Sequence, residues 1–233
     1  MSTPTHTAPK PQAQAPLFIL GRWRGVGKVY SVTERGVAKI HYCEEMEVRR
    51  EGKAQAYWHH RQTWKTAPDA QDFASAEKIV PLHVESGVIK ILPVQGTTTI
   101  SRDAAQAQEE QSAPAAPAVL PVEGIFIHPF SVSEVARGTV TSRSSSSSPS
   151  GLEDGQDGQE QGPRPYLRLE AREADGSFHR GLGAGGKTTE VYIREYELLA
   201  DGKLLYKCAL KSNTMPEPWE HLECLLQRVD GEL

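Results

Sequence analysis

Two histidines lie in apolar surroundings, where a neutral imidazole can hold a metal ion. His83 follows Pro81-Leu82 at the start of an apolar segment, and His221 lies between Trp219 and Leu222 near the end of the chain. A single histidine in such surroundings is also a common partly buried residue. The residue pattern therefore leaves metal binding and simple packing open for both.

Adjacent pairs of polar residues offer less to a shared site. His59-His60 and Glu44-Glu45 each lie within a segment that reads as a β-strand. Neighbouring side chains on a strand point to opposite faces, so neither pair can serve one interior site. With no Ser-His-Asp order and no paired carboxylates, the sequence favours no hydrolase.

A glycine-rich run over residues 181–188 (GLGAGGKT) matches the phosphate-binding pattern GxxxxGK[ST]. That pattern binds phosphate when a helix N-terminus follows the loop. Here residues 189–198 alternate between polar and apolar residues as a strand does. We therefore interpret the run as a hairpin loop, with Lys187 as a cation at its tip.

The segments that must position these residues have the composition of strands, being short and rich in β-branched or aromatic residues. They lie near 23–30, 39–49, 55–65, 82–92, 125–128, 132–141, 166–171, 189–198, 203–211 and 219–229. No segment carries an apolar stripe with helical spacing over more than two turns. The chain is predicted to be all-β with about ten strands.

Turn residues between the strands predict how the strands connect. Glu51-Gly52, Asp175-Gly176 and Asp201-Gly202 separate strand-like runs, and glycine supplies the positive φ that a tight hairpin turn needs. Consecutive strands should therefore pair in antiparallel fashion. Closing such a sheet removes its exposed edges, so we predict an antiparallel up-and-down β-barrel with an internal ligand cavity.

Three polar stretches carry too few apolar residues to offset the entropy of ordering the chain. They are an N-terminal tail over 1–16 and two insertions over 103–121 and 142–165. We expect all three to be disordered. The remainder, within 17–233, is long enough for a single barrel domain.

Composition narrows the function classes further. The formal net charge of −4 gives no electrostatic case for binding nucleic acid or an anionic membrane, and no apolar run is long enough for a transmembrane helix. The three cysteines are widely spaced and odd in number, which predicts neither a disulfide framework nor a CxxC zinc site. A reducing compartment such as the cytoplasm is therefore expected.

One short motif resembles a known family. Gly21, Trp23, Gly25 and Gly27 form a GxWxGxG pattern that is similar to the first strand of the nitrobindin family of haem-binding β-barrels, which includes the C-terminal domain of a THAP-type zinc-finger protein. Six more segments resemble family motifs in the same order along the chain: 42–45 (YCEE), 62–65 (QTWK), 82–87 (LHVESG), 128–135 (ending in EV), 194–196 (REY) and 218–222 (PWEHL). The resemblance spans 17–229 apart from the two insertions.

This resemblance implies one haem b per chain with His221 as its axial ligand. It implies that His83 lines the same cavity and takes part in catalysis without ligating iron. Thr33, His128 and Lys187 are implied as further cofactor-binding residues, with Lys187 near the pocket mouth, where it pairs with a haem propionate.

The activity that the resemblance implies is isomerisation of peroxynitrite to nitrate at ferric haem, together with nitric oxide binding. The expected partners are haem and these small ligands, without nucleic acid or membrane, and both a monomer and a homodimer stay open. Two other classes also stay open: a non-catalytic carrier of a fatty acid or other apolar molecule, and an interaction scaffold that uses the polar insertions.

Overall fold

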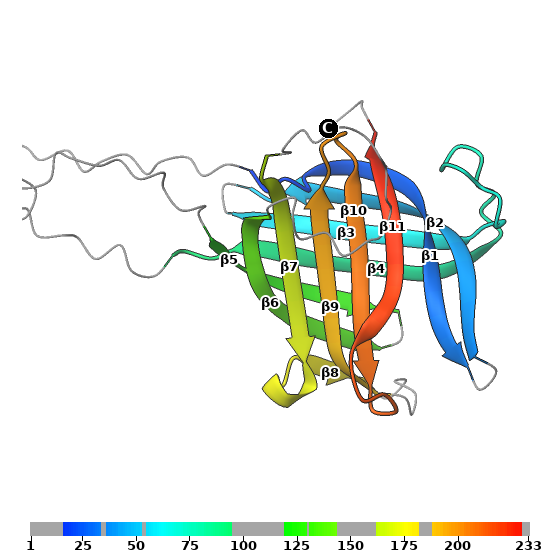
Figure 1. Ribbon diagram of the computed structural model, residues 1–233. Helices are drawn as coiled ribbons and strands as arrows, with labels where there is room; N and C mark the ends of the chain where they lie inside the picture. The colour runs from blue at the N-terminus through cyan, green and yellow to red at the C-terminus, as the bar shows by residue number, and fades with distance from the viewer. Residues whose placement is uncertain are drawn as a thin grey trace, which may run out of the picture.

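The computed structural model describes residues 16–33, 36–52, 55–94, 119–129, 131–143, 162–181 and 188–229. Strands dominate these residues (Figure 1): β1 (Gly21–Thr33), β2 (Gly36–Arg50), β3 (Ala56–Lys65), β4 (Val80–Ile91), β5 (Leu120–His128), β6 (Val132–Arg143), β7 (Arg164–Arg172), β8 (Phe178–Arg180), β9 (Thr189–Leu198), β10 (Leu204–Ser212) and β11 (Trp219–Arg228). A 3-10 turn, η3 (Glu173–Asp175), precedes β8. Within these ranges, no helix has the length and apolar character needed to cross a membrane.

The strands close into an antiparallel barrel, as the sequence predicts. The sheet order is β5-β4-β3-β2-β1-β11-β10-β9-β7-β6-β8, and β5 also pairs with β6. This last pairing closes ten of the described strands into a ring, and within the described residues β8 pairs only with β6. The first strand, β1, lies beside the last, β11, in the ring.

Alternation along the strands sorts side chains between the interior and the outer surface. On β3, His59 is fully buried, whereas His60 lies partly exposed and stacks on Trp58 with 5.3 Å between ring centroids. Burial lowers the pKa of His59 to about 4, so its imidazole is neutral at neutral pH. The prediction that His59 and His60 face opposite sides is confirmed.

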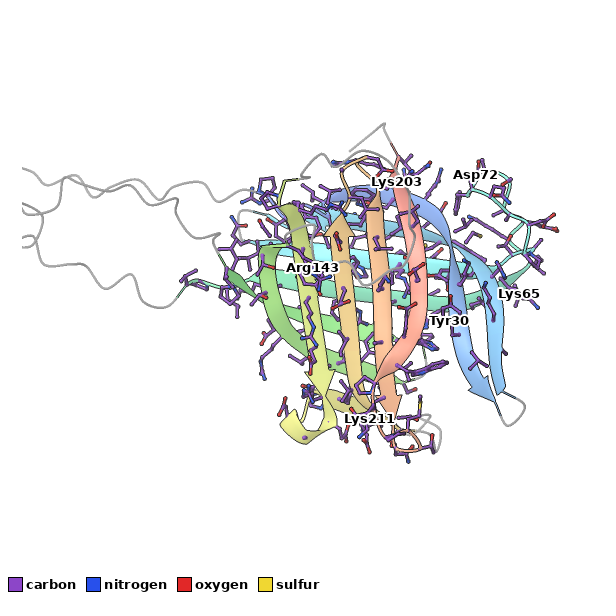
Figure 2. All side chains as sticks on the ribbon, viewed as in Figure 1. Tyr30, Lys65, Asp72, Arg143, Lys203 and Lys211 are labelled. Atoms are coloured by element: carbon purple, nitrogen blue, oxygen red, sulfur yellow. The ribbon has the colours of Figure 1, made fainter. Side chains whose placement is uncertain are left out.

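Apolar residues that precede β1 pack at one end of the barrel. Leu17 and Ile19 precede β1 and are buried. The indole Nε1 of Trp23 donates a hydrogen bond to the carbonyl oxygen of Ile19 over 2.8 Å, and the backbone N–H of Leu17 donates to the hydroxyl of Tyr57 over 3.3 Å. In Figure 2, Lys203 marks this end of the barrel and Lys211 marks the opposite end.

Two glycines of the GxWxGxG motif have a structural role. A Cβ atom on Gly25 would lie 2.0 Å from the carbonyl oxygen of Leu225, and one on Gly27 would lie 2.4 Å from that of Glu223. Only glycine lets β1 approach β11 this closely. The motif thus permits the pairing of the first strand with the last.

The structure corrects one predicted hairpin. Glu51-Gly52 and Asp201-Gly202 connect paired strands, but Asp175-Gly176 does not. Gly176 ends η3 with a φ of 68°, and the chain then continues into β8, which pairs with β6. β8 cannot pair with β7 because both edges of β7 are occupied by β6 and β9.

Strands also extend into the ends of the two predicted insertions. β5 begins at Leu120, β6 continues to Arg143 and β7 begins at Arg164. Leu120 pairs with Val140, and Arg143 pairs with Arg164. Pairing with a neighbouring strand therefore orders residues that the polar, proline-rich composition predicts to be disordered. The ranges 1–15, 95–118 and 144–161 lie outside the described residues.

Candidate functional site

A cavity of about 350 Å³ opens at the Lys211 end of the barrel. Strand ends around the ring supply its walls. The lining residues are Val29, Ile40, Arg61, Thr63, Leu82, His83, His128, Val132, Glu134, Phe178, Thr189, Tyr192, His221 and Leu222. Both histidines singled out by their apolar surroundings, His83 and His221, therefore face one cavity.

His221 on β11 presents one ring nitrogen to this cavity. Its Nδ1 lies 2.9 Å from the backbone carbonyl oxygen of Tyr30 on β1. Because a carbonyl oxygen only accepts, Nδ1 donates its proton and the neutral ring keeps its lone pair on Nε2. Burial also lowers the pKa of His221, which keeps the ring neutral. This is the state in which histidine ligates a metal.

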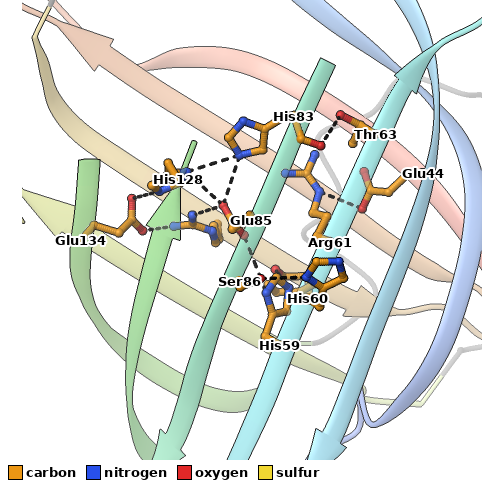
Figure 3. Close-up of polar contacts among 12 residues, drawn as sticks. Glu44, His59, His60, Arg61, Thr63, His83, Glu85, Ser86, His128 and Glu134 are labelled. Atoms are coloured by element: carbon orange, nitrogen blue, oxygen red, sulfur yellow. Dashed lines mark hydrogen bonds and ion pairs between the residues drawn. The ribbon is translucent and has the colours of Figure 1, made fainter. Parts of the chain in front are cut away.

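His83 on β4 and His128 at the end of β5 form a pair on the cavity wall (Figure 3). The Nε2 atom of His83 lies 3.3 Å from Nδ1 of His128. The other nitrogen of His128, Nε2, lies 3.2 Å from a carboxylate oxygen of Glu134 on β6. The structure thus brings together two residues expected to bind the cofactor.

Glu85 lies beneath the histidine pair and is fully buried. Its Oε2 atom is 3.8 Å from His83 Nε2 and 3.5 Å from His128 Nδ1. Burial opposes ionisation, but the guanidinium of Arg194, 2.6 Å away, outweighs it and holds the pKa of Glu85 well below its usual value. Glu85 is therefore a carboxylate whose side chain shares an inward face with His83.

Arg194 on β9 links two carboxylates inside the barrel. Its guanidinium bonds both Glu85 and Glu134 and is fully buried. It also lies 4.1 Å from the ring centroid of Phe126 and 4.3 Å from that of Tyr192, distances typical of cation–π contacts. These contacts fix both carboxylates behind the histidine pair.

A second buried ion pair lies beside the first. The Nε atom of Arg61 on β3 is 2.9 Å from a carboxylate oxygen of Glu44 on β2, and the guanidinium lies over the ring of Tyr206. Burial raises the pKa of Glu44, although Arg61 opposes this shift. Glu45 instead pairs with Arg24 over 3.0 Å at a partly exposed position, so Glu44 and Glu45 face opposite sides as predicted.

The sequence predicts that Glu85 shares a strand face with His83 and can orient its ring, but it assigns no role to Glu134 or Arg194. Glu85, Glu134 and Arg194 all lie within segments noted for their resemblance to family motifs, and each occupies an inward position of an alternating strand. A charged residue at an inward position is the signal that would have marked them, because such residues are buried only with partners.

Two residues that are expected to bind the cofactor have side chains that the structure does not describe. Lys187 lies outside the described residues, as does the rest of 182–187. Thr33 ends β1 and pairs with Gly36, but its side chain is not among those described. The strand expected after the glycine-rich run is confirmed as β9, which excludes the helix that a phosphate-binding loop requires.

The cavity has the donor chemistry and the walls that an iron porphyrin needs. Val29, Ile40, Leu82 and Leu222 supply an apolar lining, and the Nε2 lone pair of His221 supplies a neutral nitrogen ligand. The polar side chains of His83 and His128 are available to a small ligand in the same space. The residues present therefore fit haem.

Comparison with known families gives one match. A family model described as "THAP4-like, heme-binding beta-barrel domain" matches residues 13–148, which is more than half of the chain. The matched region includes β1–β6 with His83 and His128, whereas His221 lies beyond it. A search of curated proteins found no match.

Proposed function

Because the chain belongs to the THAP4-like, nitrobindin-type family of haem-binding β-barrels, we propose that it holds one haem b per chain with His221 as the axial ligand. The observation that carries this proposal is the hydrogen bond from His221 Nδ1 to the carbonyl oxygen of Tyr30. That bond selects the tautomer whose Nε2 can bind iron and fixes the ring plane.

The proposed activity is isomerisation of peroxynitrite to nitrate, with nitric oxide as a second ligand. When bound, ferric haem supplies a Lewis-acidic iron for this chemistry. The chain contributes the polar part of the cavity wall: His83 and His128 present ring nitrogens to a small anion, and Glu85 and Glu134 hold those rings in place. His83 is the proposed catalytic residue because it is the more exposed of the two.

Two further residues belong to this proposal. Lys187 pairs with a haem propionate, and Thr33 lies near the small ligand. Thr189, two residues after Lys187, lines the cavity, which supports a position of Lys187 near its mouth. A charge-reversing Lys187→Glu variant should weaken haem binding without abolishing it, because His221 is retained.

Haem titration tests the axial assignment. The full chain should take up one equivalent of haem with an intense Soret band, and His221→Ala should lose most of this affinity. His179→Ala is the matched control, because His179 is exposed on β8 and does not line the cavity. Equal haem affinity and an unchanged spectrum in His221→Ala would overturn the assignment.

An apolar-ligand carrier is the second candidate, and the apolar walls of the cavity favour it. A fluorescent fatty acid added to the haem-free chain separates the two functions. A carrier should bind it tightly and show weak, non-stoichiometric uptake of haem. The haem protein should instead release the fatty acid when one equivalent of haem is added.

We also propose a reducing compartment, such as the cytoplasm, as the site of action. Cys43, Cys208 and Cys224 are all buried and unpaired in the structure. Thiols that are needed for packing and form no disulfide suit a reducing environment.

A further inference from the structure

Three potential metal ligands converge on the cavity wall without His221. They are Nε2 of His83, Nδ1 of His128 and the Oε2 atom of Glu85, and they come from two neighbouring strands, β4 and β5 (Figure 3). We propose that these atoms form a binding site for a divalent first-row transition metal ion such as Zn²⁺ or Fe²⁺. The site does not include His221, the proposed haem ligand, but His83 and His128 line the same cavity.

The spacing of the donors matches metal coordination. The three separations are 3.3 Å between the two imidazole nitrogens, 3.5 Å from His128 to Glu85 and 3.8 Å from His83 to Glu85. Nitrogen and oxygen ligands bind Zn²⁺ at about 2.0–2.2 Å in a tetrahedron, which places neighbouring ligand atoms about 3.4 Å apart. A metal ion can therefore contact all three atoms with small side-chain adjustments.

The surroundings orient two of the donors. His128 Nε2 lies 3.2 Å from Glu134 Oε2, so the ring donates to this carboxylate and presents the lone pair of Nδ1 to the cluster. Arg194 holds Glu85 at 2.6 Å and also bonds Glu134. A histidine ligand backed by a carboxylate is the usual outer-shell arrangement of protein metal sites.

Charge at the cluster favours a cation. Arg194 carries one positive charge and faces the carboxylates of Glu85 and Glu134, so these three groups carry one net negative charge when ionised. A net negative charge attracts a cation, and a divalent ion changes the net charge of these groups from −1 to +1. A proton on His128, which lies between the two carboxylates, is the competing way to supply positive charge.

The donor types indicate which ion fits. Two imidazoles and one carboxylate favour zinc, iron, copper or nickel over the all-oxygen sites of Mg²⁺ and Ca²⁺. Three protein ligands leave at least one coordination position open, as in catalytic rather than structural sites. The side chains of His83 and His128 are 22% and 10% exposed and both line the cavity, so an ion and a small ligand can reach them.

Metal titration of the full chain tests this site. Haem-free protein treated with a chelator is titrated with Zn²⁺ in a calorimeter and with Co²⁺ by visible absorption. We expect one ion per chain and a Co²⁺ spectrum of low coordination number. His83→Ala and His128→Ala should each weaken binding at least tenfold, whereas His221→Ala and His179→Ala should leave it unchanged.

A further variant addresses the supporting carboxylate. Glu134→Gln should weaken Zn²⁺ binding by roughly 10–100-fold, which is typical of lost outer-shell partners. Circular dichroism checks that each variant is folded, and the two partly exposed histidines keep the test valid if Glu134→Gln does not fold. The proposal would be overturned if no stoichiometric Zn²⁺ binding is found, or if the Zn²⁺ affinity is unchanged in both His83→Ala and His128→Ala. The histidines and carboxylates would then share a proton and bind no metal ion.

The outcome is independent of haem binding. If His221→Ala keeps Zn²⁺ binding but loses haem, both proposals stand. If haem binding fails in the unaltered chain while Zn²⁺ binding depends on His83 and His128, only the haem function is wrong. If the unaltered chain binds haem but Zn²⁺ binding does not depend on His83 and His128, only the metal site is wrong.

Discussion

His221 on β11 donates its Nδ1 proton to the backbone carbonyl of Tyr30 on β1, 2.9 Å away. Figure 2 shows Tyr30 on the strand that lies beside β11. These are the first and last strands of the barrel, separated by most of the sequence. The imidazole is therefore oriented only when β1 and β11 have paired, which makes the orientation of the proposed haem ligand depend on folding of the whole chain.

Removal of Arg194 should destabilise the fold strongly, because it leaves buried charges without a partner. Arg194→Met leaves the buried carboxylates of Glu85 and Glu134 without their cation, and breaking a buried pair in this way costs about 3–5 kcal/mol. Urea unfolding of the two proteins measures the difference in free energy of unfolding.

A surface pair provides the control for this measurement. Arg168 on β7 is 41% exposed and pairs with Glu170 and Glu195. Arg168→Met should cost less than about 1 kcal/mol. If Arg194→Met is no more destabilising than Arg168→Met, the interior charges are not held as the structure indicates.

The three cysteines should be unreactive in the folded chain. All are buried, and burial raises the pKa of Cys208 to about 12 and the pKa values of Cys43 and Cys224 above their usual value. The thiolate is the reactive form, so a disulfide reagent at pH 8 should titrate three thiols only after denaturation. Ser75→Cys, at an exposed position, adds a rapidly reacting control. Native thiols that react as fast as this control would contradict the burial.

The segments that connect β4 to β5 and β6 to β7, which contain most of the two polar insertions, should be dispensable for haem binding. Ile91 pairs with Val122, and Arg143 pairs with Arg164, so the chain ends on either side of each insertion are already neighbours. Short Gly/Ser links in place of 96–117 and 145–161 should leave the Soret band unchanged, since closing a shorter loop costs little. Loss of haem uptake in either protein would show that the removed residues belong to the pocket.

His83 should influence small ligands more than haem retention. It lies on the cavity wall beside His128 and Glu85, where it can hydrogen-bond a ligand, and the resemblance implies that it does not ligate iron. His83→Leu should retain haem and change the kinetics of anion and nitric oxide binding in stopped-flow measurements. A bis-imidazole resonance Raman signature that disappears in His83→Leu would contradict an open iron site.

Much of the fold was predictable because its signals are local. Strand alternation, as in the inward His59 and outward His60, depends on the period of two along one segment. The pattern at Asp175-Gly176 predicts a hairpin because glycine follows an acidic residue. This local pattern does not show that both edges of β7 already pair with β6 and β9.

The site was predictable only in part because it depends on register between distant strands. Resemblance to family motifs singled out His83 and His221, and both line the cavity. The contact of Arg194 with Glu85 joins residues 109 positions apart. No local pattern states which inward positions of β4 and β9 meet, so the charge network follows only from the closed barrel.

Chemical rescue of the axial ligand tests the central claim most directly. His221→Gly removes the imidazole and leaves space beside β1, so the variant should lose the ferrous iron–histidine stretching band in resonance Raman and most of its haem affinity. Added imidazole should restore both, while His179→Gly should need no rescue. An iron–histidine band that persists in His221→Gly without imidazole would contradict ligation of haem by His221.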